Sequence, residues 1–75
     1  MKQQRDRLLA GRFHQRFLVT LHDGTGIGGL LVDVDEAVIV LANVVYMPRD
    51  PKAQQINVDG QLFIERSNIA YMQSL

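Results

Sequence analysis

Hydrophobic and polar positions alternate along most of this chain with a period of two, which is the pattern of β-strands. In residues 12–22, Phe13, Phe17, Val19 and Leu21 share one face, and mainly polar residues occupy the other. Residues 37–47 form a valine-rich apolar run, which is typical of a strand covered on both faces. Residues 25–35, 54–65 and 69–73 complete a set of five predicted strands. Five short strands with turns about every ten residues predict a small antiparallel β-barrel that closes on itself.

Turn residues separate these strands. Asp23-Gly24 predicts a tight hairpin between the first two strands, because glycine takes the positive φ that such a turn needs. Gly26, Gly28 and Gly29 follow within the second strand and indicate a sharp bend or a close backbone approach. The proline-containing segment 47–52 predicts a surface loop. A tight connection is expected at 66–68.

The N-terminal segment differs from the rest of the chain. Residues 2–10 are predicted to form a short helix that ends at Gly11. We therefore expect one domain over residues 1–75, with a helix or arm at 1–11 and the barrel at 12–75. A domain this small has a marginal core, and the absence of cysteine excludes disulfides. Self-association through unpaired edge strands is the expected extra support.

Charge is distributed unevenly although the chain has no net charge. Residues 1–16 hold five basic side chains and one acidic one, a net +4, and residues 17–75 hold three basic and seven acidic ones, a net −4. One interpretation is an anion-binding arm in which Lys2, Arg5 and Arg12 contact nucleic acid. The other is that the arm lies on the acidic body of its own or a neighbouring subunit.

Other candidate chemistry is weak. The glycine cluster lacks the lysine and the following helix of a phosphate loop. A divalent-ion or acid–base site is conceivable at the neighbouring carboxylates Asp33, Asp35 and Glu36. No further ligand or catalytic partner accompanies them in the sequence. His22 beside Asp23 is interpreted as a hairpin residue. We expect no enzyme activity, catalytic residue, metal or cofactor. The chain has no apolar run of membrane-spanning length and no signal-peptide pattern, so we expect a soluble, cytoplasmic protein without membrane contact.

Two motifs resemble those of the Sm and Sm-like (LSm) family. Gly24, Gly29 and Asp35 match the spacing of its first motif, and the segment Ile64-Glu65-Arg66-Ser67-Asn68-Ile69 resembles its second. The resemblance covers Phe17 to Gln73 and implies an Sm-like, SH3-like barrel. It also implies a homo-oligomeric ring whose usual ligand is single-stranded RNA rich in uridine or adenine.

Departures from the family pattern change the expected function. The stacking side chain and the amide of the family's RNA-binding members fall on Ala37 and Ile39, and the arginine of the second motif falls on Glu65. Loss of a stacking platform alone removes about 1–3 kcal/mol per base. We therefore predict a ring that serves as a scaffold or interaction module, with a degenerate base pocket. The alternative is an RNA-binding ring that uses Arg66 and Asn68 in a divergent pocket.

Overall fold

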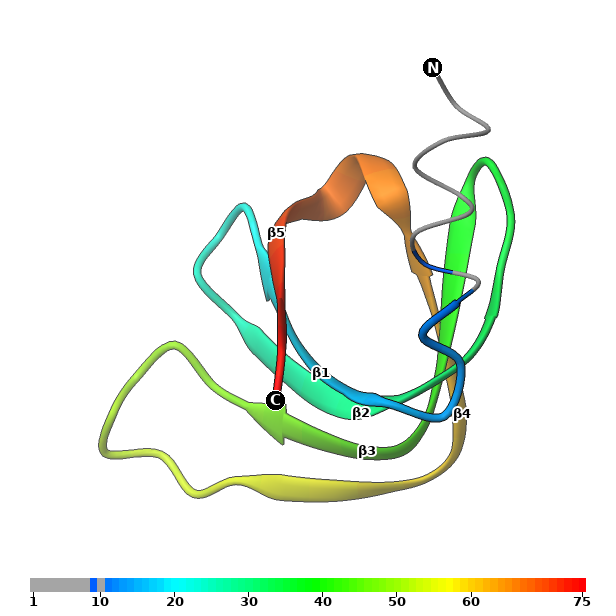
Figure 1. Ribbon diagram of the computed structural model, residues 1–75. Coiled ribbons are helices and arrows are strands. Elements are labelled where there is room, and N and C mark those ends of the chain that lie inside the picture. The colour runs from blue at the N-terminus through cyan, green and yellow to red at the C-terminus, as the bar shows by residue number, and fades with distance from the viewer. Residues whose placement is uncertain (1–8, 10) are drawn as a thin grey trace.

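Five antiparallel strands form one strongly curved sheet in the computed structural model, which describes Leu9 and residues 11–75 (Figure 1). The elements are β1 (Arg16–Leu21), β2 (Gly26–Val34), β3 (Val38–Met47), β4 (Ile56–Glu65), a 3-10 turn η1 (Arg66–Asn68) and β5 (Ile69–Ser74). The spatial order is β4-β3-β2-β1-β5. The predicted five-stranded antiparallel sheet is confirmed, whereas the helix predicted at residues 2–10 lies almost wholly outside the described residues.

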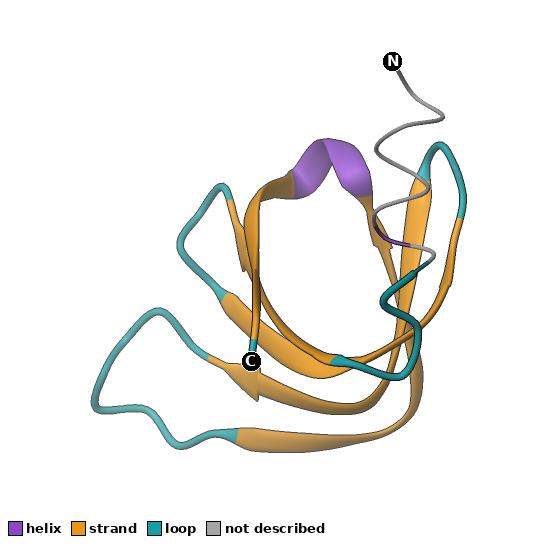
Figure 2. Cartoon of the chain, in the orientation of Figure 1, coloured by secondary structure: helices purple, strands orange, loops and turns teal. Residues whose placement is uncertain are grey.

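The sheet does not close, so the predicted closed barrel is wrong for a single chain. β4 and β5 are the two edges of the sheet, and η1 joins them at one end without a ladder between them (Figure 2). β5 has only six residues, and all of its ladder runs along β1. β4 pairs instead with β3, along the β3 residues from Val38 to Tyr46. Over the described residues, β4 and β5 therefore each have one unpaired edge.

The first strand starts later than the alternation predicts. Residues 12–15 form a turn in which His14 has a φ of 68°, and His14 N donates to the Leu31 carbonyl at 2.7 Å. The turn leaves Phe13 39% exposed, so this aromatic ring is not part of the core. A backbone kink thus interrupts a pattern that reads as continuous in the sequence.

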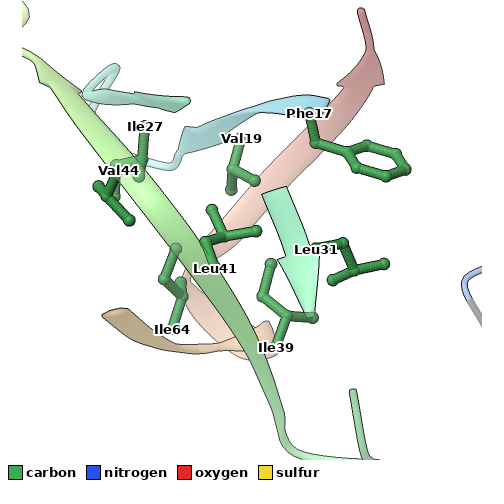
Figure 3. Close-up of a cluster of buried hydrophobic side chains, with 8 residues drawn as sticks. All are labelled: Phe17, Val19, Ile27, Leu31, Ile39, Leu41, Val44 and Ile64. Atoms are coloured by element: carbon green, nitrogen blue, oxygen red, sulfur yellow. The ribbon is translucent and has the colours of Figure 1, made fainter. Parts of the chain in front are cut away.

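The core lies on the concave face of the sheet (Figure 3). Ile39, Leu41 and Leu31 are fully buried there, and each such side chain contributes about 1.5–3 kcal/mol. Partly buried side chains pack against this cluster, namely Leu9, Leu21, Val34, Leu62, Ile69 and Met72. The whole cluster consists of Phe17, Val19, Ile27, Leu31, Ile39, Leu41, Val44 and Ile64.

Glycine and irregular register produce the bend. A Cβ atom on Gly29 would lie 3.0 Å from the Ala42 carbonyl oxygen, so β2 and β3 approach closely there. One register shift spans Gly29, between Gly28 and Leu30, and a second follows between Leu31 and Asp33. The predicted bend in the second strand is therefore present where β2 pairs irregularly with β3.

Candidate nucleic-acid interface and edge strands

The turn between β2 and β3 and the turn η1 meet at one end of the sheet. Arg66 N donates to the Ala37 carbonyl at 2.8 Å, and the Arg66 guanidinium donates to the Asp35 carbonyl at 2.7 Å. The two sequence motifs, about 30 residues apart in the chain, are thus joined by backbone contacts. This is the place where a pocket built from both motifs would lie.

Asp35 holds the first of these turns in shape. Its Oδ1 accepts hydrogen bonds from Ala37 N at 2.8 Å and Val38 N at 2.7 Å. These amides, with a smaller contribution from the Arg66 charge, lower the pKa of Asp35 below its ordinary value of 3.8. The carboxylate is therefore committed to bracing the turn, as an Asx-turn residue does.

Three positions near this junction differ in chemistry from the family's base-contacting residues. Ala37 is exposed but has no stacking surface, and Ile39 is fully buried in the core, with no route to a ligand. Glu65 is exposed and carries the wrong sign of charge for phosphate. The amide of a family-like asparagine at position 39 would face the core, where a polar group without a partner is costly.

Three of the five predicted nucleic-acid residues fall within the described part of the chain, in two different turns. Arg66 and Asn68 lie together in η1, where the Asn68 carbonyl accepts from His22 N at 3.1 Å and leaves the exposed side chain available. Arg12 is exposed in the separate turn before β1. Lys2 and Arg5 lie outside the described residues. The assignment of all five residues to nucleic acid therefore stays a prediction.

Asp23, beside His22, has a structural role in the hairpin. Asp23 Oδ1 accepts from Thr25 N at 2.9 Å in the hairpin turn, and hydrogen bonds from Thr25 lower the pKa of Asp23. Within the described part of the chain, no three His, Asp or Glu side chains are grouped so that they could hold a metal ion. None of the helices over these residues is long and apolar enough to cross a membrane.

The two edge strands, β4 and β5, carry exposed apolar side chains. Every residue of β4 from Ile56 to Gln61 is exposed, and Ile56 keeps 53% of its surface accessible. Phe63 and Tyr71, on the two edges, are 68% and 57% exposed. The sequence did contain a signal for Phe63, because its neighbours Leu62 and Ile64 face the core and a strand alternates.

The curved sheet, with its motif-bearing turns in contact, is the Sm fold. No family model matches the sequence, and no curated protein matches it. Solved structures do: the P. aerophilum SmAP1 heptamer has 17% identity and a TM-score of 0.80 over 93% of this chain and 90% of the other. A Pyrococcus abyssii Sm protein, solved in complex with a uridine heptamer, has 18% identity and a TM-score of 0.74 over 92% and 94%. The SmAP (LSm) protein of Methanococcus vannielii has 23% identity and a TM-score of 0.70 over the full length of both chains. The predicted resemblance in fold is confirmed.

Proposed function

We propose that this chain is a non-enzymatic Sm-like protein that assembles into a homo-oligomeric ring and serves as a scaffold or interaction module. The observation that carries the proposal is the uncovered first half of β4. Ile56 and Val58 on this strand, with Tyr46 beside them on β3, expose apolar surface in the single chain. A further copy whose β5 adds to this edge would bury that surface and pair the free backbone groups.

The relatives in fold support assembly. The P. aerophilum protein is a heptamer, and another similar structure is that of a heptameric archaeal Sm protein. An edge that presents backbone donors and acceptors to the next copy gives a heterologous contact, and a curved repeat of such contacts closes into a ring.

The junction chemistry favours a scaffold over a base-reading ring. The Pyrococcus abyssii relative was solved with a uridine heptamer. This chain has Ala37, Ile39 and Glu65 where stacking, amide and cationic groups would be needed, and each change removes a favourable contact. We propose that nucleic acid, where bound, contacts the basic arm with Lys2, Arg5 and Arg12. The second candidate, a divergent pocket, is favoured by Arg66 and Asn68 sharing η1 at the junction.

Light scattering on the purified chain tests assembly. We expect a mass several times that of one 8.5 kDa chain at micromolar concentration. Ile56→Asp should shift the mass toward the monomer, because it places a charge in the proposed interface. Gln54→Asp, in the exposed loop before β4, is the matched control and should leave the mass unchanged. A monomeric wild-type protein contradicts the proposal.

Binding of labelled oligouridine at physiological salt separates the two candidates. If the chain is a scaffold, deletion of residues 1–12 should abolish any oligouridine binding that the intact ring shows. Arg66→Ala should retain this binding. The reverse result, with loss of binding in Arg66→Ala and retention after the deletion, supports the divergent pocket instead. Light scattering on both variants is the control for ring integrity.

A further inference from the structure

The convex face of the sheet, opposite the core, carries a row of apolar and acidic side chains. In the register of the strands, Val40 on β3 lies opposite Asp33 on β2 and opposite Phe63 on β4. Val38, two residues earlier on the same face, lies opposite Glu65, and its carbonyl accepts from Asp35 N at 2.9 Å. Ile39, between these two valines, faces the core. Val38 and Val40 therefore form an apolar floor, with the carboxylate of Asp33 on the β2 side and that of Glu65 on the β4 side.

This surface is hollowed into a groove of about 170 Å³. Its volume is below the roughly 300–1,000 Å³ of small-molecule and cofactor sites, so it suits a single side chain. The lining residues are Asp33, Val34, Asp35, Val38, Val40 and Phe63, none of which is basic. Phe63 is 68% exposed at the side of the groove, which makes it an unusually uncovered aromatic residue for a sheet face.

The charges of the groove select a cation. Asp33 uses Oδ1 to accept from Val34 N at 2.8 Å, and among the described residues no cation pairs with it. Arg66 is not one of the lining residues, although its guanidinium donates to the carbonyl of Asp35, which is. An exposed aromatic ring beside carboxylates favours arginine, because a guanidinium stacks on the ring and hydrogen-bonds to carboxylate oxygens.

We infer that this acidic groove, defined by its six lining residues, docks an arginine from a basic, apolar-flanked segment of a partner protein. The apolar floor receives the flanking side chain or the arginine stem, and Asp33 with Phe63 holds the guanidinium. RNA is the wrong partner for this face, because its phosphates would meet Asp33, Asp35 and Glu65. The inference gives the proposed interaction module a partner chemistry and therefore rests on that proposed role.

Fluorescence anisotropy with the full chain tests the groove. The probe is a short fluorescein-labelled peptide in which arginine alternates with valine, and matched peptides carry lysine or glutamate in place of arginine. We expect the arginine peptide to bind more tightly than the lysine peptide, and the glutamate peptide not to bind. Asp33→Asn keeps an oxygen for the Val34 amide and should weaken binding about two- to fivefold. Phe63→Leu, which keeps an apolar side chain, should have a similar effect.

Asp50→Asn is the control, because it removes the same charge from an exposed loop position outside the groove and keeps an oxygen for the Lys52 amide. Equal weakening by Asp50→Asn and Asp33→Asn would reduce the effect to net charge and overturn the inference. Equal affinity for the arginine and glutamate peptides would do the same. A changed mass of Asp33→Asn in light scattering would make the groove a contact between copies, and lower oligouridine affinity in that variant would make it an RNA surface. Either result overturns the partner assigned here, whereas a monomeric wild-type protein contradicts the ring proposal separately.

Discussion

Gly29 is the position where the bend in β2 is most sensitive to a single methyl group. The added Cβ of Gly29→Ala would lie 3.0 Å from the Ala42 carbonyl oxygen and 3.1 Å from Leu41 Cβ. The first of these atoms belongs to the backbone of β3, so relief of the clash requires the two strands to separate. Overpacking of this kind costs about 1–3 kcal/mol, and the stiffer unfolded chain of alanine offsets about 0.4–1 kcal/mol. We expect a net loss of about 1–2 kcal/mol.

Thermal unfolding followed by circular dichroism measures this loss. For a domain of this size, about 1–2 kcal/mol corresponds to a Tm lower by roughly 4–16 °C. The matched control is Gly26→Ala in the same strand, whose Cβ would meet its nearest atoms at an ordinary 3.5 Å. That variant should melt at or slightly above the wild type. Protein concentration must be fixed, because assembly raises Tm by mass action. If Gly29→Ala melts as high as Gly26→Ala, the close approach of β2 and β3 is not what requires glycine.

Three further perturbations test other parts of the fold. Because hydrogen bonds lower the pKa of Asp35 in the folded state, its stabilising effect is complete above the ordinary value of 3.8 and is lost as pH falls through the lower folded value. Urea unfolding of the wild type should therefore lose more stability on acidification than Asp35→Asn does, and equal losses would contradict this role. Gly60→Ala should cost about 1 kcal/mol in the same assay from its φ of 83° alone, since its Cβ would meet nothing within 4 Å; an unchanged midpoint would show that the strain is relieved. Ile39→Asn should lower stability by at least about 2 kcal/mol, because it places an amide in the core, and a stable variant with tighter oligouridine binding would refute the burial argument.

Local chemistry in the sequence was sufficient for the elements and their turns. Alternation predicted five strands, and Asp23-Gly24 predicted a hairpin turn in which Gly24 has a φ of 92°. These features depend on neighbours in the chain, namely the two-residue period of a strand and the freedom of glycine at positive φ. The same local reading extended β1 through residues 12–15. It missed the turn there because a polar residue at positive φ leaves little signal in one sequence.

Long-range pairing decided the rest. The sequence by itself put Ala37 and Ile39 at two of the family's base-contacting positions. Only the tertiary structure put Ile39 in the core and joined Arg66 to the Asp35 carbonyl. It also left β4 and β5 as open edges and aligned Asp33, Val40 and Phe63 across three strands. Each of these outcomes depends on the register between strands, which a one-residue shift would move to the opposite face. The sequence determined which residues alternate, and the register decided which of them meet.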